Sequence, residues 1–164
     1  QPLLKPEARG LDYGCGPVPA LAQLIEDNGH HMETYDPFFK PVFHEALYDF
    51  VTCTEVLEHV FDLYNVIAHI DELLVEGGHF AIMTEIFSDK IDFSNWRYRD
   101  DDTHICFFRA ATINFIARKY KFKIEYFDKE RVIIFKKYRS LNNIIFDLVF
   151  KYFFLHIHKP RLLH

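Results

Sequence analysis

Two glycines and an acidic residue stand close together near the start of the chain, in the segment LDYGCGPVP at positions 11–19. Gly14 and Gly16 would let the backbone turn sharply from a strand into a helix and leave N–H groups open to a ligand. Asp12 places a carboxylate just before this turn. Asp36 follows Gly16 by 20 residues, a spacing at which a carboxylate can accept hydrogen bonds from ribose hydroxyls. The pattern therefore predicts a nucleoside site.

A second group of chemically capable residues lies at 54–59, in the segment TEVLEH. If residues 55–59 form a helical turn, Glu55, Glu58 and His59 share one face. Carboxylate oxygens and an imidazole nitrogen on one face can hold a divalent ion such as Mg²⁺, Mn²⁺ or Zn²⁺. Acidic residues in the first turn of a helix are also stabilised by its macrodipole, without any ion. The residues alone leave both interpretations open.

Strands and helices alternate along most of the chain, and both groups lie where a strand ends. The segment 38–47 is predicted to be irregular, and Gly77-Gly78 to end one helix and precede the next strand. Alternation at such short intervals indicates a parallel sheet covered by helices on both faces. The apolar patterns predict strands at 9–15, 31–35, 48–54 and 79–86, and helices at 17–28, 65–74 and 109–120.

The pattern changes after the last of these helices. Strands predicted at 121–127 and 131–137 are separated by only three residues, which is too short for a crossover and makes an antiparallel hairpin. We therefore predict an α/β fold of the Rossmann-like class, with a mostly parallel twisted sheet and an antiparallel hairpin at its end. Residues 1–139 would form this domain. Residues 140–164 would form a hydrophobic helical tail that docks on the domain or joins two copies in a homodimer.

The glycine turn is compatible with two kinds of cofactor. The dinucleotide site of a nicotinamide dehydrogenase requires GxGxxG, and Pro19 occupies the third glycine position here. An acid before the glycines suits a cationic ligand instead. Over residues 9–137 the chain resembles the class I S-adenosylmethionine-dependent methyltransferases. Their first motif is an acid followed by GxG, their second strand ends in a ribose-binding acid, and an antiparallel hairpin closes their sheet.

This resemblance implies that S-adenosylmethionine is the cofactor, and it assigns the binding residues. Asp12, Gly14 and Gly16, with Cys15 between the glycines, would line the methionine part, and Asp36 would hold the ribose. Three residues at the end of the third predicted strand would face the crevice beside the cofactor; they are Cys53, Thr54 and Glu55.

The ExxEH segment, with His104 further along the chain, is similar to metal-dependent O-methyltransferases. These include the small-RNA 2′-O-methyltransferases and, for the ExxEH part, the ubiquinone-pathway O-methyltransferases. The resemblance implies that Glu55, Glu58, His59 and His104 hold Mg²⁺ or another divalent cation, which would lower the pKa of a substrate hydroxyl. Without an ion, His59 and His104 are the candidate general bases that remove a proton from the acceptor.

Together these patterns predict an S-adenosylmethionine-dependent methyltransferase that acts on an oxygen of a small molecule. One alternative is a 2′-O-methyltransferase of RNA ends, which His104 favours and the net charge of −5 disfavours. Another is a catalytically silent cofactor-binding module, which is consistent with Val18 where the family often has a third glycine. The loop NWRYR at 95–99 could cover a substrate with a ring and two cations, or it could form an exposed connection.

The cysteines and the apolar segments of the chain indicate where in the cell the protein is located. The three cysteines are far apart and lack CxxC spacing, so neither a disulfide framework nor a zinc knuckle is indicated. The longest apolar stretch, 144–157, is interrupted by polar side chains and is shorter than the roughly 20 residues of a membrane span. We therefore expect a cytoplasmic protein without a transmembrane segment. The chain begins with Gln1, which suggests that a leading segment is missing.

Overall fold

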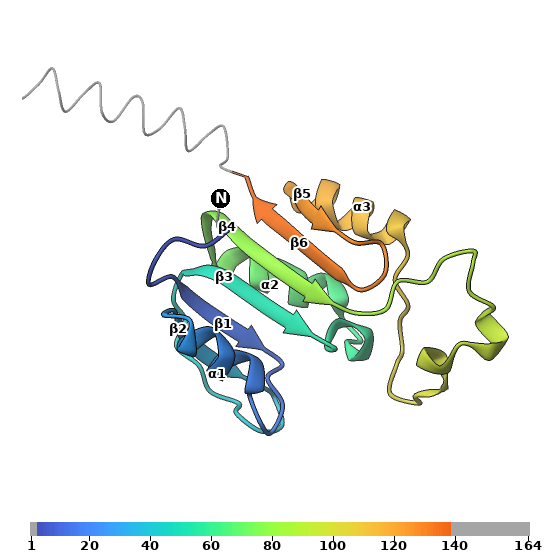
Figure 1. Ribbon diagram of the computed structural model, residues 1–164, viewed down its shortest axis with the longest axis horizontal. Helices are drawn as coiled ribbons and strands as arrows, with labels where there is room; N and C mark the ends of the chain where they lie inside the picture. Colours follow the sequence, from blue (N-terminus) through green and yellow to red (C-terminus); the bar gives the residue numbers. More distant parts are fainter. Residues whose placement is uncertain (1–2, 139–164) are drawn as a thin grey trace, which may run out of the picture.

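Six strands among residues 3–138, the part of the chain that the computed structural model describes, form one sheet in the order β2-β1-β3-β4-β6-β5 (Figure 1). The pairs β1–β2, β1–β3 and β3–β4 are parallel, and β6 pairs antiparallel with both β4 and β5. The predicted α/β fold, with a mostly parallel sheet and an antiparallel hairpin at its end, is confirmed. The strands are β1 (Arg9–Tyr13), β2 (His31–Tyr35), β3 (Tyr48–Thr54), β4 (Leu74–Met83), β5 (Phe122–Phe127) and β6 (Val132–Lys137).

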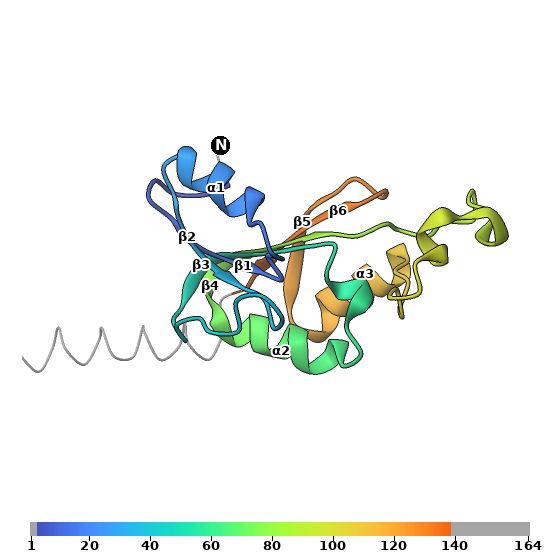
Figure 2. The ribbon, with the colours of Figure 1, turned by 90° about the horizontal axis from the view of Figure 1, so that it is seen from below.

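Helices cover both faces of this sheet. The helix α1 (Ala20–Asp27) lies on one face, and α2 (Leu63–Leu73) and α3 (Ala110–Lys119) lie on the other (Figure 2). Residues three and four positions apart share a face of a helix, so the apolar residues of α2 and α3 form stripes that pack on the strands. The residues buried in this way are Ile67, Ile70, Leu73, Ile113, Ile116 and Ala117.

The central strands β3 and β4 carry much of the core. Successive residues of a strand point to opposite faces, yet Phe50 and Val51 on β3 are both buried. On β4, the adjacent residues His79 and Phe80 are buried as well. This burial on both faces is expected of a parallel sheet between two helical layers. The core therefore holds the carboxyl ends of the parallel strands in fixed positions at one edge.

The connection between β2 and β3, residues 36–47, is irregular, as predicted. Asp36 and Lys40 pair across a tight turn through reciprocal backbone hydrogen bonds of 3.0 and 2.9 Å. Phe43 and Ala46 pack against the core, so this connection covers part of the sheet without forming a helix. Within the described residues, β2 and β5 are the two terminal strands of the sheet.

The connection between β4 and α3, residues 84–109, projects beyond the carboxyl end of β4 (Figure 1). It contains two short 3₁₀ turns, Phe93–Asn95 and Arg97–Asp100. Trp96, the single tryptophan of the chain, is buried between these turns. Its ring lies 5.4 Å from that of Phe87 and 5.3 Å from that of Phe107, measured between centroids. These aromatic contacts give the connection a small core of its own.

One predicted boundary is wrong. We expected Gly77-Gly78 to end a helix and to precede a strand, whereas β4 begins at Leu74 and contains both glycines. The pairing of β3 with β4 shifts register between Tyr48 and Phe50, so β4 bulges opposite these residues. Gly77 has a φ of 80°, a left-handed conformation that glycine adopts without a steric penalty. The glycines therefore form a bulge within the strand and are not the end of a helix.

The other predicted strands and helices are present, with ends that differ by three residues or fewer. Differences of this size are usual because the ends of such elements fray. The predicted helical tail at 140–164, and the homodimer inferred from it, lie outside the described residues. Within residues 3–138, every helix is too short or too polar to cross a membrane.

A polar cluster joins the first three strands. Glu33 on β2 accepts hydrogen bonds from the guanidinium of Arg9, from the hydroxyl of Tyr48 at 3.0 Å and from the backbone N–H of His44 at 3.1 Å. Burial opposes the ionisation of Glu33, but these donors together outweigh it and lower its pKa to about 2. The charged form of Glu33 therefore stabilises the folded state.

We expect Glu33→Gln to lower the free energy of unfolding by about 2 kcal/mol at neutral pH, because the amide loses the charge-assisted hydrogen bonds. Since the pKa of Glu33 in the folded state lies below its ordinary value of 4.5, this contribution is present above pH 4.5 and is lost as the pH falls toward 2. Urea unfolding across this range would measure it. Glu26→Gln, an exposed acid on α1, is the control. A difference between Glu33→Gln and wild type that stays constant with pH would contradict the prediction.

Candidate cofactor and metal site

The glycine turn after β1 is held beside the end of β2. The N–H groups of Gly14 and Cys15 both donate to the carbonyl of Tyr35, at 2.7 and 3.0 Å. Gly14 and Gly16 have φ values of 88° and 64°, in the left-handed region where most side chains are strained. The sequence thus predicted both the place of the turn and the need for glycine.

The two glycines of the turn have different surroundings. A Cβ atom added to Gly14 would lie 2.3 Å from Cγ2 of Val56, so the close approach of these two segments requires glycine. A Cβ atom added to Gly16 would meet no atom within 4 Å. The backbone at Gly16 therefore borders open space, which a ligand needs if it is to approach the turn.

Asp36 lies beside this turn, immediately after β2, and is buried. Its Oδ2 atom accepts the N–H of Gly16 at 3.0 Å, and its Oδ1 atom accepts those of Phe38 and Phe39 at 2.9 and 3.1 Å. A carboxylate oxygen can accept two hydrogen bonds, so Oδ2 keeps capacity for another donor. The structure brings Asp36 and the glycine turn together, as the spacing predicted.

Asp12 is buried near the end of β1, next to the turn. The hydroxyl of Thr52, the residue paired with it on β3, donates to Oδ1 of Asp12 at 2.8 Å. Burial raises the pKa of Asp12, and the bond from Thr52 and the charge of Lys40 offset part of this rise. A positively charged ligand group near Asp12 would favour its ionised form.

The cysteines near the turn do not provide a nucleophile. Cys53 lies in the hydrophobic core, and burial raises its pKa well above the ordinary value. Burial also raises the pKa of Cys15. Thiols with raised pKa values are weak nucleophiles at neutral pH. We expected the side chain of Cys53 to face the crevice, but it is buried in the core. Thr54 and Glu55 are half-buried at the end of β3.

The segment after β3 differs from the predicted helical turn. Glu55 has a φ of 51°, and only Leu57–His59 form a 3₁₀ turn. The N–H of Glu55 donates to the carbonyl of Met83 at 2.8 Å, which fixes this residue to the end of β4. Glu55 therefore does not share a helical face with Glu58 and His59, because its backbone is not helical.

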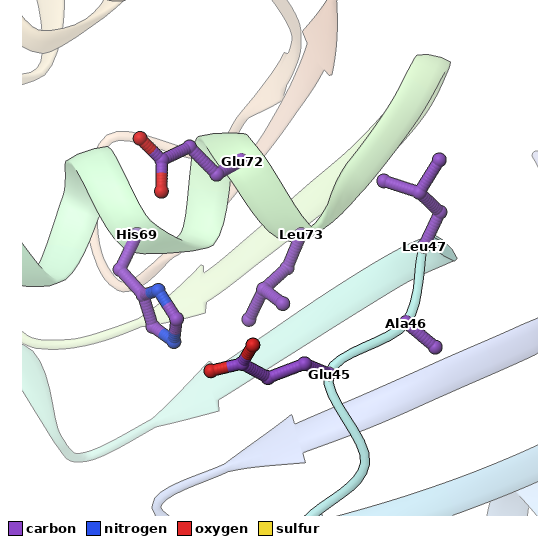
Figure 3. Close-up of a pocket in the computed structure, with 6 residues that line it drawn as sticks. All are labelled: Glu45, Ala46, Leu47, His69, Glu72 and Leu73. Carbon is purple, nitrogen blue, oxygen red and sulfur yellow. The ribbon is translucent and has the colours of Figure 1, made fainter.

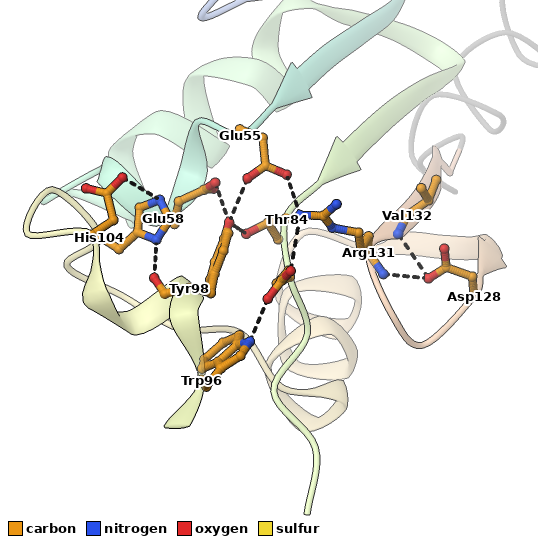
Figure 4. A network of polar contacts seen from close by, with 11 residues as sticks. Glu55, Glu58, Thr84, Trp96, Tyr98, His104, Asp128, Arg131 and Val132 are labelled. Atoms are coloured by element: carbon orange, nitrogen blue, oxygen red, sulfur yellow. Dashed lines mark hydrogen bonds and ion pairs between the residues drawn. The ribbon is translucent and has the colours of Figure 1, made fainter. Parts of the chain in front are cut away.

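Tyr98 lies between the two glutamates (Figure 4). Its hydroxyl is 3.1 Å from Oε2 of Glu55, 2.5 Å from Oε1 of Glu58 and 3.0 Å from Oγ1 of Thr84. Thr84 follows β4 directly, and Tyr98 belongs to the second 3₁₀ turn of the connection at 84–109. One hydroxyl therefore joins the end of β3, the end of β4 and this connection.

His59 and His104 are neighbours, with ring centroids 4.6 Å apart. Nδ1 of His59 is 3.1 Å from the carbonyl oxygen of Thr103, and Nδ1 of His104 is 2.6 Å from that of Tyr98. A carbonyl oxygen only accepts, so each Nδ1 carries a proton in these bonds, and a neutral ring then has a lone pair on Nε2. Metal-binding histidines are commonly oriented in this way. Asp101 lies 3.8 Å from Nε2 of His104.

Glu58, His59 and His104 form a group whose potential ligand atoms all lie within 4.8 Å of one another. Glu58 is completely buried, and its Oε2 atom has no hydrogen-bond partner among the described residues. A buried carboxylate oxygen without a partner destabilises the folded state unless another group binds to it, and a divalent cation could bind there. Glu55, the fourth ligand that the sequence resemblance implied, is not part of this group.

Glu55 belongs instead to a row of charged side chains (Figure 4). The guanidinium of Arg131 lies 3.7 Å from Oε1 of Glu55 and 3.2 Å from Oε1 of Glu85. Nε1 of Trp96 donates to Oε2 of Glu85 at 2.6 Å. Burial first, and the neighbouring Glu58 second, raise the pKa of Glu55. The row thus leads from the glutamate pair to the aromatic side chains of the connection at 84–109.

Sequence reasoning missed Thr84, Glu85 and Arg131 as residues of this site, and it singled out Tyr98 only as part of the loop at 95–99 that could cover a substrate. They come from the end of β4, the connection after it and the β5–β6 hairpin, and no spacing in the sequence relates them. One signal was available for Glu85. It lies just after the carboxyl end of a parallel strand, as Asp36 does, and ligands of open α/β sheets bind at that edge.

A cavity of about 350 Å³ lies apart from these residues, between the segment that precedes β3 and the last turns of α2 (Figure 3). The ring of His69 and the carboxylate of Glu45 point toward each other across it. Leu47 leads into β3 and Leu73 precedes β4, so the cavity opens beside the amino ends of these strands. We assign no function to it.

Comparison with protein families gives a match over most of the chain. A family model described as a methyltransferase domain matches residues 1–126. A ubiquinone biosynthesis O-methyltransferase of Pectobacterium carotovorum subsp. carotovorum (strain PC1) is 33% identical to the chain over 82 residues. This match covers 48% of the chain and 34% of the relative, so the chain matches about a third of the relative's length.

Solved structures show the same fold. An S-adenosylmethionine-dependent methyltransferase from Archaeoglobus fulgidus superposes with a TM-score of 0.63 at 18% identity, covering 79% of this chain and 86% of that one. A 1,6-didemethyltoxoflavin-N1-methyltransferase from Burkholderia thailandensis, solved with 1,6-didemethyltoxoflavin and S-adenosylhomocysteine, gives 0.62 at 16% identity, covering 82% and 72%. The family match shows that the chain belongs to the methyltransferase-domain family, and these solved structures show that it has the fold of class I methyltransferases.

Proposed function

We propose that the protein transfers a methyl group from S-adenosylmethionine to an oxygen of a small molecule. One juxtaposition carries this proposal: the glycine turn and Asp36 lie at the same edge of the sheet as the group of Glu58, His59 and His104. This edge is formed by the carboxyl ends of β1, β2 and β3, where ligands of open α/β sheets bind. A cofactor and an acceptor could therefore meet there.

The residues around the turn fit the cofactor. Open space at Gly16 would let a ligand approach the backbone, and Asp36 keeps acceptor capacity for ribose hydroxyls. The carboxylate of Asp12 is complementary to the positive charges of the methionine part. The proposed cofactor-binding residues are Asp12, Gly14, Cys15, Gly16, Asp36, Thr54, Glu55 and the backbone of Cys53.

When bound, S-adenosylmethionine supplies an electrophilic methyl group attached to a positively charged sulfur. The protein's part is to align the acceptor oxygen and to provide for the loss of its proton. His59 and His104, when neutral, each have a lone pair on Nε2 that can accept this proton. They are the proposed general bases if no metal ion is bound.

We also propose that Glu58, His59 and His104 hold a divalent cation. The fit rests on one buried carboxylate oxygen without a partner and on two histidine rings oriented through Nδ1. Three protein ligands leave coordination positions open, as catalytic metal sites require. A divalent ion there would supply a Lewis acid that favours the loss of a proton from a hydroxyl group. The mixed nitrogen and oxygen donors suit Mn²⁺ or Zn²⁺ better than Mg²⁺.

Two observations support an oxygen of a small molecule as the acceptor. The partly matched relative is named an O-methyltransferase, and carboxylate and histidine ligands suit an ion that activates a hydroxyl group. The net charge of −5 disfavours a polyanionic acceptor. Binding of an RNA oligonucleotide that weakens steeply with salt would instead favour the RNA-end alternative.

We expect calorimetric titration to show binding of S-adenosylmethionine and of S-adenosylhomocysteine, and Asp36→Asn to weaken both at least about tenfold, or about 1.4 kcal/mol. The amide removes a carboxylate acceptor and turns a donor toward the N–H of Gly16 or toward those of Phe38 and Phe39.

Glu26→Gln, which removes an exposed acid on α1, should bind both compounds as the wild type does. Unchanged affinity in Asp36→Asn would show that Asp36 does not hold the ribose. A wild-type protein that binds neither compound would refute the proposed function.

A further inference from the structure

We propose that a cavity between the end of β4 and the β5–β6 hairpin binds the methyl acceptor, and that the acceptor is a flat aromatic acid. This inference rests on the proposed function, because it supplies the acceptor for that reaction. The cavity has a volume of about 440 Å³. Small-molecule sites commonly have volumes of about 300–1,000 Å³, so the cavity can hold one or two rings.

One wall of the cavity is apolar. It is formed by Ile86 and Ile91, from the segment after β4, and by Trp96. Ile86 and Trp96 are buried, and Nε1 of Trp96 donates to Glu85, so the indole ring is held in one orientation. A flat ring gains most from such a wall, because it can pack against aromatic and aliphatic side chains and displace water from them.

The opposite wall is charged and richer in free donors than in free acceptors. Both carboxylate oxygens of Glu85 are already engaged, one by Trp96 and one by Arg131. The ion pairs of Arg131 use only its Nη2 atom, so other donors of the guanidinium are left for a ligand. Within residues 3–138, no ion pair holds the ammonium of Lys129. Against these donors stands the exposed carboxylate of Glu130.

The hairpin that carries Arg131 is held in place before any ligand arrives. The backbone N–H of Thr84 donates to the carbonyl of Arg131 at 3.0 Å, and the backbone N–H of Ile86 donates to the carbonyl of Glu130 at 2.8 Å, so the hairpin is tied to the end of β4. Glu85 holds the guanidinium at 3.2 Å. A pre-ordered guanidinium is suited to bidentate binding of a carboxylate and loses little freedom on binding it.

Arg131 also connects the cavity to the proposed reaction site. Its guanidinium lies 3.2 Å from Glu85, which lines the cavity, and 3.7 Å from Glu55, which shares the hydroxyl of Tyr98 with Glu58. Arg131, Glu55 and Tyr98 therefore form a chain of contacts between a ring held in this cavity and Glu58.

The emission of Trp96 can measure occupation of the cavity, because it is the only tryptophan of the chain. Benzoate, benzyl alcohol and benzylamine share one ring and carry a negative, a neutral and a positive substituent. We expect benzoate to change the emission with a Kd at least about tenfold lower than that of benzyl alcohol, and benzylamine to bind more weakly than both. Raising the salt concentration should weaken the binding of benzoate and leave the binding of benzyl alcohol unchanged.

Matched variants separate the charge effect from a general loss of structure. Lys129→Gln should weaken benzoate about threefold to tenfold and leave benzyl alcohol unchanged, as expected for the loss of one exposed charge. Lys123→Gln, the same change on β5 outside the cavity, should alter neither.

Three results would overturn the proposal: no emission change with any probe, equal binding of all three, or tighter binding of benzylamine. None of these measurements requires the methyl donor. Cofactor binding in the calorimeter without benzoate binding would refute the cavity proposal alone. Benzoate binding without cofactor binding would refute the proposed function and leave an aromatic-acid site.

Discussion

Replacing Glu58 with Gln is expected to raise the stability of the metal-free protein and to abolish its stabilisation by Mn²⁺. Glu58 has no exposed surface, its Oε2 atom has no partner among the described residues, and Glu55 lies beside it. Without a cation, a buried charge in this position is uncompensated and opposes folding. Gln keeps the shape of the side chain and an oxygen that can accept the hydrogen bond from Tyr98.

We expect the free energy of unfolding of the metal-free variant to exceed that of the wild type by about 1 kcal/mol. The wild type should gain about 2.7 kcal/mol when free Mn²⁺ is at about 100 times its Kd, and the variant should gain none. Thermal unfolding with a chelator and with Mn²⁺ measures both effects. Glu72→Gln, an exposed acid on α2, should keep the Mn²⁺ effect. If Mn²⁺ still stabilises Glu58→Gln, Glu58 is not a ligand. If the metal-free variant is less stable than the metal-free wild type, the protein itself compensates the charge of Glu58.

Gly14→Ala is expected to lower the free energy of unfolding by about 3 kcal/mol. Its added Cβ atom would lie 2.3 Å from Cγ2 of Val56, and the φ of 88° would place a side chain in the left-handed region. The left-handed conformation costs about 1–2 kcal/mol, and overpacking costs about 1–3 kcal/mol. Urea unfolding measures the loss.

Two further variants separate these two costs. Gly16→Ala has a φ of 64° but meets no atom within 4 Å, so it should show the backbone cost alone. The double variant Gly14→Ala with Val56→Ala removes the two closest atoms, Cγ2 at 2.3 Å and Cγ1 at 2.8 Å, and leaves Cβ at 3.2 Å, so a double-mutant cycle should recover most of the overpacking part. If Gly14→Ala is no less stable than Gly16→Ala, the contact with Val56 does not require glycine.

Much of the fold could be predicted because its signals are local. The strands at 31–35 and 48–54 were predicted with their observed bounds, since Pro37 ends the first and the second is a run rich in β-branched and apolar residues. Asp36 could be placed beside the glycine turn because parallel strands bring their carboxyl ends to one edge. The bounds of the strands depend on a few neighbouring residues, and the place of Asp36 depends on the parallel pairing of β1 and β2.

The errors arose where distant segments decide the local conformation. Glu55 was assigned to a helical turn, but the bond from its N–H to the carbonyl of Met83 holds it at a φ of 51°. The bulge at Gly77 depends on the register with β3, which one strand alone does not reveal. The contact of Tyr98 with both glutamates likewise joins separate elements, so no helical or strand period predicts it.

Two backbone hydrogen bonds tie the connection before α3 to Glu58. The N–H groups of Ile105 and Cys106 both donate to the carbonyl of Glu58, at 2.9 and 3.1 Å, and the same connection carries Tyr98 and His104. A single local opening of this connection would separate the glutamates from the tyrosine and the two histidines from each other. Because that opening exposes both amides to solvent, their hydrogen exchange reports the free energy that keeps the site assembled, separately from the global stability of the sheet.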